Sequence, residues 1–219
     1  MVDGGGRRFV NESLNYNDAG RALAQLPGLR PDGAVAWLIF DSSYRKRYHI
    51  GTIRRDAPDP EWLVSVSSLE EMEFELGIPG GQLEETVVEF NRDVARGVDT
   101  RFQRGQSAYD RFVGDPTSPN PSLGEVVAPP YYALPVLPGC LGTKGGPVTD
   151  EDGRVLSEGT PVPGLYAVGN TAANPLGTAY PGAGGTIGPH LVFGRRAGRA
   201  AGEKWSLTMF LHRPNRVGD

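Results

Sequence analysis

The sequence predicts an α+β protein that is built as two incomplete lobes. Residues 34–41 (AVAWLIFD) form a continuous apolar run, which is typical of a strand buried on both faces. Residues 80–98 instead place apolar side chains three and four positions apart, as in an amphipathic helix with one core face. The composition changes near residue 126, from charged sequence with helices to short strands and many glycines. We therefore expect a first lobe over residues 1–125, a second over 126–205 and a tail over 206–219.

In the first lobe, two helices are bounded by residues at their ends. Ser68 is a candidate N-cap, with Glu71 three positions later as its reciprocal partner in a capping box and Gly77 as the stop. Gly97 ends the longer helix in the same way. The other segments are expected as a second strand or an extended loop (45–53) and as irregular surface (99–130).

The second lobe is expected to hold short strands and one last helix. Residues 129–138 (PPYYALPVLP) show strand-like alternation. Asp152 and Gly153, between two short apolar runs, are typical of a tight hairpin turn. Residues 164–170 (GLYAVGN) are expected as a last buried strand. Pro189 then opens the final helix, because an N–H in the first turn needs no acceptor within the helix.

Composition narrows the class of protein. The 219 residues carry 22 Lys and Arg against 26 Asp and Glu, a net charge of −4 without a long basic block, so nucleic acid is not an expected partner. No apolar run is long enough to span a bilayer and residues 1–13 lack the apolar core of a signal peptide, so we expect a soluble, cytoplasmic protein. The lone Cys140 has no Cys or His partner at ligand spacing, so we expect a small packed residue and no metal site.

The most unusual feature is a dense run of glycine and proline over residues 164–198. Such a run indicates positive φ angles or a close approach of backbone to a ligand. A strand ending at Gly169 and Asn170 would press its N–H groups against that ligand, and the turn at Gly188 and Pro189 would aim the positive end of a helix at it. A dinucleotide such as FAD needs both contacts. A flexible linker and ligand-free turn packing are the alternatives, and the apolar segments on both sides disfavour the linker.

Several motifs, in order along nearly the whole chain, resemble one family. GLYAVGN, YPGAGGTIGP and FGRRAG, with the upstream PGCLGTKGGPVTDEDGRVL and FNRDVARGVD, resemble the C-terminal part of 3-ketosteroid Δ1-dehydrogenases, in the fumarate reductase and succinate dehydrogenase flavoprotein superfamily. GRRFVNESLNY and FDSSYRKRY resemble the steroid-binding region of those enzymes. The resemblance implies a partial substrate (cap) lobe and the C-terminal part of an FAD-binding Rossmann-like lobe. It also implies FAD as cofactor and a steroid as small-molecule substrate.

The resemblance also implies residue roles. In that family a 3-keto steroid loses a proton from carbon 2 and a hydride from carbon 1, and the hydride goes to the flavin. Tyr180 and the N–H of Gly184 match the pair that hydrogen-bonds the keto oxygen, an oxyanion-type site. Tyr16 matches the proton-abstracting tyrosine, which needs either a pKa lowered from about 10 or a proton relay. The expected cofactor-binding residues are Gly169, Asn170, Gly185, Thr186, Ile187, Gly188 and Pro189.

Each assignment has a simpler structural alternative. Tyr180 is compatible with a half-buried aromatic whose hydroxyl bonds to backbone, and Tyr16 with packing at a lobe boundary. His190 stands where the resembling enzymes usually have a small residue, and we assign it to the first turn of the final helix, near the flavin edge. Lys144 is not assigned a role, because a contact to the cofactor and simple exposure to solvent are both compatible with its place in the sequence.

The glycine-rich segment also bears on the substrate, because it carries no arginine between Gly164 and Phe193. Fumarate reductases of the superfamily have an arginine-containing turn at the corresponding place, and its guanidinium clamps a carboxylate with two hydrogen bonds. The sequence therefore favours a neutral ketone over a dicarboxylate.

The N-terminal βαβ unit that binds the ADP half of FAD in this superfamily is missing from the sequence. Residues 4–6 are three glycines, but we expect no strand before them and no helix after them, so they do not match that fingerprint. We therefore expect the C-terminal portion of a longer flavoenzyme, with the missing N-terminal half or a complementing chain as its partner and with unpaired strand edges. The alternatives are a non-catalytic remnant and another flavoprotein of the superfamily, acting on a different ketone or on the steroid 4,5-bond.

Overall fold

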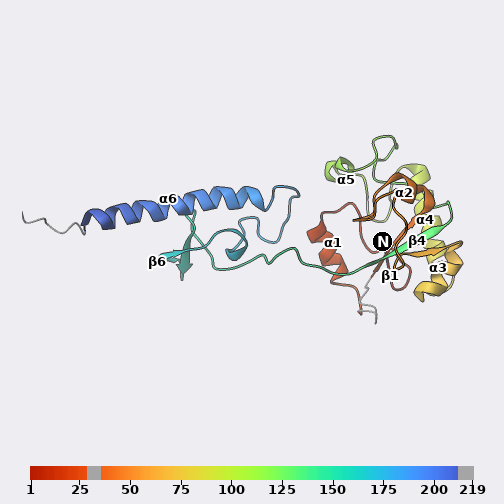
Figure 1. Cartoon of the computed structure of the whole chain (residues 1–219), viewed down its shortest axis with the longest axis horizontal. Coiled ribbons are helices and arrows are strands. Elements are labelled where there is room, and N and C mark those ends of the chain that lie inside the picture. The colour runs from red at the N-terminus through yellow and green to blue at the C-terminus, as the bar shows by residue number, and fades with distance from the viewer. Residues whose placement is uncertain (29–35, 212–219) are drawn as a thin grey trace, which may run out of the picture. The chain divides into compact units, whose positions relative to one another are not determined.

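The computed structural model describes residues 1–28 and 36–211, with side chains up to residue 203. The chain forms two compact units, Met1–Gly139 and Cys140–Asp219 (Figure 1). The first unit holds a four-stranded sheet and five helices among its described residues, and the second holds a two-stranded sheet, a 3-10 turn and one long helix.

An antiparallel sheet in the order β1-β2-β4-β3 is the centre of the first unit. Strand β2 (Ala36–Asp41) pairs with β4 (Tyr131–Val136) along its full length, from Ala36 opposite Val136 to Asp41 opposite Tyr131. The outer strands are β1 (Val2–Asp3) and β3 (Val64–Val66). The expectation that no strand precedes the glycines at 4–6 is therefore wrong, because β1 ends directly before them, but no helix follows within residues 7–15. The strands predicted over 34–41 and 129–138 are thus confirmed, except that residues 34 and 35 lie outside the described residues.

Helices α3 (Leu69–Leu76) and α4 (Gln82–Arg96) follow the predicted bounds closely. The side chain of Ser68 accepts a hydrogen bond from the N–H of Glu71, and Gly77 ends α3 with φ +64°. The capping box is only half formed, because the carboxylate of Glu71 accepts from the N–H and hydroxyl of Ser67. Helix α4 ends at Gly97 with φ +71°, as predicted.

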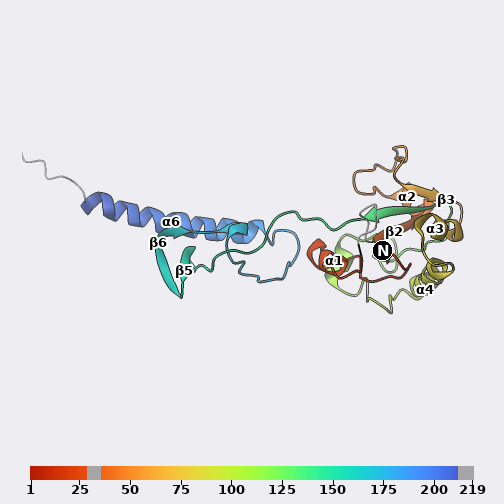
Figure 2. The ribbon, with the colours of Figure 1, turned by 90° about the horizontal axis from the view of Figure 1, so that it is seen from below.

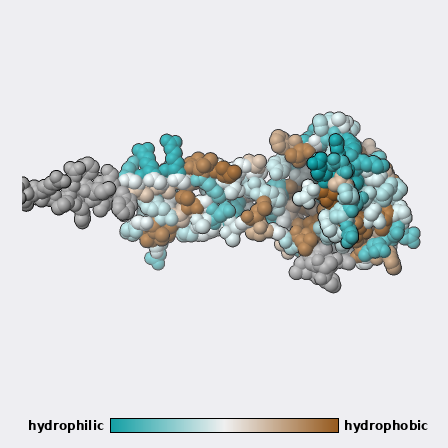
Figure 3. Space-filling view, viewed as in Figure 1, coloured by the Kyte–Doolittle hydropathy of each residue, from teal (hydrophilic) through white to brown (hydrophobic). Residues whose placement is uncertain are grey.

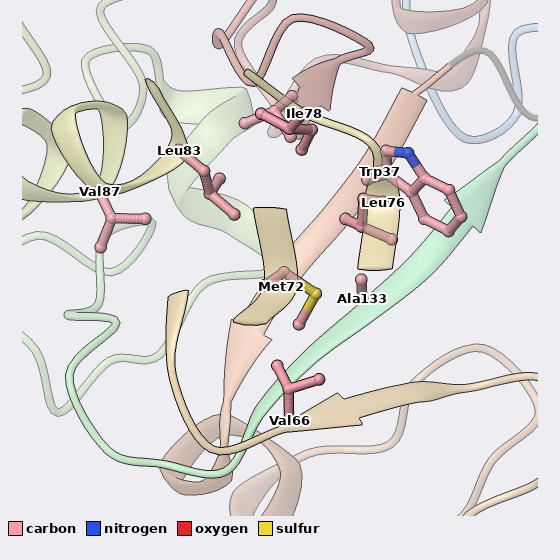
Figure 4. Close-up of a cluster of buried hydrophobic side chains, with 9 residues drawn as sticks. Trp37, Val66, Met72, Leu76, Ile78, Leu83, Val87 and Ala133 are labelled. Carbon is pink, nitrogen blue, oxygen red and sulfur yellow. The ribbon is translucent and has the colours of Figure 1, made fainter. Parts of the chain in front are cut away.

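These two helices pack on the sheet to form the main core of the unit (Figure 4). Met72 and Leu83 are completely buried and Leu76 is almost so. They contact sheet residues that include Trp37, Val66 and Ala133. Burying a side chain of this kind contributes about 1.5 to 3 kcal/mol, so the cluster fixes both helices on the sheet.

The expectation for residues 45–53 is wrong in its first part, because residues Ser42–Arg47 form helix α2. Asp41 at the end of β2 caps this helix: its Oδ1 accepts from the N–H of Tyr44, and its Oδ2 accepts from the N–H groups of Val127 and Ala128. A capping carboxylate turns the chain from strand to helix at once. Residues 99–130 are irregular as expected, apart from the short helix α5 (Ala108–Phe112).

A buried ion cluster fixes the segment that leads to helix α1 (Tyr16–Leu23). Arg8 donates to both carboxylate oxygens of Asp99 and also to Glu12, and its guanidinium lies 4.9 Å from the ring centre of Phe90. Burial acts to raise the pKa of Glu12, but the Met1 ammonium and Arg8 outweigh it and hold that pKa well below its usual range.

In the second unit, strands β5 (Arg154–Ser157) and β6 (Thr160–Tyr166) form a hairpin beside helix α6 (Ile187–Leu211) (Figure 2). The predicted turn at Asp152 and Gly153 is confirmed, since Thr149 and Val155 bridge across it. A Cβ at Gly153 would lie 3.0 Å from the Cβ of Ala197, so this turn packs directly on α6.

Three expectations for the second unit are wrong. The last strand is not buried: β6 ends at Tyr166 and Leu165 is 49% exposed, because no third strand pairs with this hairpin among the described residues. Cys140 is exposed and not packed, with its thiol donating to the carbonyl of Gly142. The final helix begins at Ile187, which leaves Pro189 inside the first turn.

Candidate active site

A glycine-rich loop joins β6 to α6 and holds most of the predicted site residues. It begins with the 3-10 turn η1 (Gly169–Thr171). Gly169 and Gly184 have φ angles of +75° and +86°, which side chains with a Cβ rarely adopt. The loop therefore turns sharply at both places, and glycine is required there for its backbone conformation.

The start of this loop borders a hollow of about 260 Å³. The predicted cofactor residue Gly169 lines it, and the neighbouring Asn170 is exposed. The ring of His190 lies over Gly169, since a Cβ there would be 3.7 Å from three ring atoms. The other lining residues are Thr149, Asp150, Glu151, Ala167, Val168, Ala172, Ala173, Asn174, Pro175, Pro189 and Phe193.

His190 is the residue whose surroundings the sequence did not predict. Its Nε2 is buried and has no hydrogen-bond partner among the described residues. A buried polar atom without a partner is rare in proteins and points to a missing water or ligand. The sequence carries one signal, which is that His190 stands where the resembling enzymes usually have a small residue. That difference alone does not predict the direction of the His190 ring.

The first turn of α6 offers fewer free amides than the sequence suggests. The N–H of Gly188 donates to the carbonyl of Gly184 at 2.8 Å, and the N–H of His190 donates to Thr186 at 3.3 Å. Pro189 has no N–H. Gly188 and Pro189 can therefore shape a flavin site but cannot donate to it, whereas the amide of Ile187 makes no hydrogen bond to another described residue.

The two residues predicted to hold the keto oxygen lie in the same loop. Tyr180 is half-buried, and four residues later Gly184 keeps an N–H that bonds to no other described residue. The N–H of Gly185 donates to Gly182, which tightens the turn between them. The loop thus presents an unused amide close in sequence to a phenol, the two donor types that an oxyanion site needs.

Tyr16 lies in the first unit, as the first residue of α1. It is 54% exposed, and the helix start beneath it is fixed by Asn15, whose side chain accepts from the N–H of Asp18. Tyr180, Gly184 and the predicted cofactor residues lie in the second unit.

The residues of the second unit fit a flavin. The glycine loop carries an exposed amide side chain at Asn170 and an unused N–H at Ile187, and His190, with its unpartnered Nε2, lines the hollow beside the loop. These are the donor types that the polar edge of an isoalloxazine and a ribityl chain would bind.

Comparison with known proteins places the chain among flavoproteins. It belongs to the FAD binding domain family, which matches residues 1–187. Over 207 residues it is 44% identical to a 3-oxosteroid 1-dehydrogenase of Mycobacterium tuberculosis (strain ATCC 25618 / H37Rv), covering 89% of this chain and 37% of that protein. Over 204 residues it is 43% identical to a 4-oxocyclohexanecarboxylate 2-dehydrogenase of Sinomonas cyclohexanicum, covering 91% of this chain and 36% of that protein.

A solved structure agrees with these relatives. The 3-ketosteroid delta1-dehydrogenase of Sterolibacterium denitrificans, in complex with 1,4-androstadiene-3,17-dione, matches with a TM-score of 0.86 and 38% identity over 93% of this chain and 38% of that one. The predicted resemblance is confirmed, as are FAD as the cofactor and a mixed helix and sheet fold of the flavoprotein dehydrogenase type. The chain spans little more than a third of the length of these proteins. In the part of the chain that the structure describes, no helix has the length and apolar character needed to cross a bilayer.

Proposed function

We propose that this chain is the C-terminal portion of an FAD-dependent dehydrogenase that introduces the C1–C2 double bond of a 3-ketosteroid. The observation that carries this proposal is the 0.86 TM-score to a 3-ketosteroid delta1-dehydrogenase over 93% of the chain. The loop supports it, because Tyr180 and the unused N–H of Gly184 lie four residues apart in the segment that leads to α6.

In this proposal Tyr180 and Gly184 donate hydrogen bonds to the keto oxygen at carbon 3. Both bonds strengthen as negative charge develops on that oxygen, which acidifies the C2–H bond. Tyr16 accepts the proton from carbon 2, in a deprotonated state or through a relay. The glycine-rich loop would hold FAD, which would supply the acceptor for the hydride from carbon 1. The electron pair of the C2–H bond then forms the new C1–C2 double bond. The two hydrogens that leave the steroid are thus a proton from carbon 2 and a hydride from carbon 1.

The proposed flavin contacts come from both ends of the glycine-rich loop. Gly169 and Asn170 supply them at its start, and Thr186 and Ile187 supply them at its end, while Gly185, whose N–H already donates to Gly182, shapes the turn beside them. Gly188 and Pro189 let the cofactor come close to the helix. His190 is added to this set because its buried Nε2 has no partner among the described residues.

We further propose that the first unit belongs to the substrate lobe and the second unit to the flavin lobe, followed by a tail. The boundary expected near residue 126 is then at Gly139, because β4 pairs with β2 in the sheet of the first unit. A βαβ unit with the GxGxxG fingerprint, on another segment or another chain, would complete the flavin lobe. Apolar surface on the N-terminal half of α6 supports such a partner (Figure 3): Ile187, Leu191 and Val192 are 66%, 69% and 57% exposed. The cytoplasmic location expected from the sequence stays a prediction.

A chimera tests the function directly. The N-terminal part of the M. tuberculosis relative, up to the region that matches this chain, is fused to residues 1–219. We expect a yellow protein with bound flavin that oxidises 4-androstene-3,17-dione to the 1,4-diene with an artificial electron acceptor. A chimera that binds flavin but oxidises no ketone would support the non-catalytic alternative.

A second candidate function is favoured by the relative from S. cyclohexanicum, whose identity of 43% is almost as high as that of the steroid enzyme. In this alternative the chimera oxidises 4-oxocyclohexanecarboxylate faster than any steroid. Against this alternative, the segment between Gly164 and Phe193 has no arginine of its own to clamp a carboxylate with two hydrogen bonds. The same substrate panel, extended with a saturated 5α-steroid for the 4,5-bond, decides between them.

A further inference from the structure

A short segment of the second unit, residues 142–147, contacts the loop of the candidate site at several points. The carbonyl of Pro147 accepts a hydrogen bond of 3.0 Å from the N–H of Ala173. Near the other end, the Cα of Gly142 lies so close to Asn170 that a Cβ would be 3.1 Å from its Nδ2. Residues 142–147, here called the strap, therefore lie along the part of the loop where the flavin contacts are proposed.

The closest contact of the strap is at Gly146. A Cβ on this residue would lie 2.1 Å from the carbonyl oxygen of Thr171 and 2.5 Å from its carbon. Both are backbone atoms, so they cannot move aside as the end of a flexible side chain would. The strap and the loop are thus in backbone contact, which only glycine permits at this place.

Lys144 extends the contact to the ketone side of the loop. Its Nζ donates a hydrogen bond to the carbonyl oxygen of Ala179, 35 residues later in the sequence. This oxygen belongs to the peptide that joins Ala179 to Tyr180. Holding it fixes the plane of that peptide, and with it the positions of the N and Cα atoms from which the Tyr180 side chain extends. A hydrogen bond from an ammonium group is stronger than one between neutral groups.

We propose that Lys144 is a positioning residue, which orients the Tyr180 peptide from the strap. The role of the phenol as donor to a keto oxygen rests on the proposed function, but the anchoring itself does not. Lys144 acts through Ala179 and Tyr180 and touches no reacting atom in this proposal. Its charge has a second consequence: it places a cation next to a loop that has no arginine of its own.

The test compares amide hydrogen exchange by mass spectrometry in the full chain and in Lys144→Met. Peptides within residues 172–186 report on the loop, where the N–H groups of Gly177, Ala179 and Gly185 are hydrogen-bonded. We expect their exchange to become roughly five- to tenfold faster, the effect of losing one charge-assisted hydrogen bond. Peptides from β5 and β6 of the same unit should not change, which shows that the second unit of the variant is folded.

Two matched variants sharpen the test. Lys144→Arg keeps a cationic donor and should restore slow exchange. Lys46→Met removes an exposed lysine of α2 in the first unit and should leave the loop unchanged. Unchanged exchange of residues 172–186 in Lys144→Met would overturn the proposal, and so would exchange in Lys144→Arg as fast as in Lys144→Met.

The exchange result does not depend on the proposed function. In a chimera that oxidises a ketone, Lys144→Met should lower kcat while flavin content and KM change little. If the chimera has no activity at all, the proposed function fails while the anchoring by Lys144 is still decided by exchange.

Discussion

Oε1 of Glu73 in α3 accepts a hydrogen bond of 2.6 Å from the backbone N–H of Leu83 in α4. The same oxygen accepts from Glu84, and Oε2 accepts from Gly81 at 2.7 Å. Gly81 is the N-cap of α4 and has no side chain to cap it. A carboxylate from the preceding helix therefore does the capping, and its negative charge also suits the positive end of the α4 dipole.

Replacing this carboxylate should destabilise the first unit. In Glu73→Ala the buried N–H of Leu83 loses its acceptor, so we expect the free energy of unfolding to fall by about 2 to 4 kcal/mol. Chemical denaturation monitored by circular dichroism measures it. Glu75→Ala, on the exposed side of the same helix, is the control and should change stability by less than about 0.5 kcal/mol. Equal effects of the two variants would mean that Glu73 does not act as a cap.

Acid should destabilise the fold through the Arg8 cluster. Burial raises the pKa of Asp99, but its hydrogen bonds with Arg8 outweigh this, so the folded pKa values of Asp99 and Glu12 both lie below their ordinary values of 3.8 and 4.5. Groups with depressed folded pKa values stabilise fully above the unfolded pKa and lose that contribution as pH falls towards the folded pKa. We expect a Tm that falls as the pH drops below about 5, where these two carboxylates begin to be protonated in the unfolded chain.

Variants identify the source of this pH dependence. Glu12→Gln should have a lower Tm at neutral pH and a flatter decline in acid, because one of the depressed carboxyls is gone. Glu125→Gln, at an exposed position, should keep the wild-type profile. If both variants showed the same profile, the buried cluster would not be the group that titrates.

The backbone contact at Gly146 predicts an asymmetry between two neighbouring glycines. Both Gly145 and Gly146 have positive φ angles, of +142° and +156°, but only Gly146 has backbone within reach of an added Cβ. Gly146→Ala should therefore destabilise the second unit by about 2 kcal/mol more than Gly145→Ala. Thermal unfolding followed by limited proteolysis of the second unit measures the difference. Similar losses in both variants would show that conformational strain, and not the contact with Thr171, dominates.

Tyr180→Phe tests the proposed donor to the keto oxygen. In an active chimera, kcat should fall about 100- to 1000-fold, the usual effect of removing one oxyanion donor. Flavin absorbance should not change, because the ring stays and only a hydroxyl is lost. Tyr109→Phe in the first unit is the matched control. A Tyr180→Phe enzyme with full kcat would leave Tyr180 as a packed aromatic.

Tyr16→Phe tests the proposed base. The variant should lose about 100- to 10,000-fold in kcat, as expected when proton transfer is removed. It should also fail to exchange the C2 proton of a bound ketone with deuterated solvent. Exchange at the wild-type rate with reduced turnover would assign Tyr16 to binding and not to proton transfer.

Local sequence determined the elements whose ends are chemically marked. Ser68, Gly77 and Gly97 bound α3 and α4 because a cap or a left-handed glycine acts within one turn of the residue itself. The same holds for the hairpin turn at Asp152 and Gly153. The motifs around the glycine-rich loop were sufficient to predict the family and FAD as the cofactor. Close approach of the backbone to a ligand requires glycine at particular positions, so it is visible in the sequence, whereas side-chain packing requires no such pattern.

Only the tertiary structure decided what depends on partners distant in sequence. Residues 42–47 became helical because Asp41 caps them while also holding residues 127 and 128, and β6 is exposed because nothing among the described residues covers it. Glu73 over α4, Lys144 on Ala179 and the ring of His190 over Gly169 have no local signature. Each is a contact between a side chain and the backbone of another segment, 10 or more residues away in the sequence. Its geometry therefore exists only when both segments are folded.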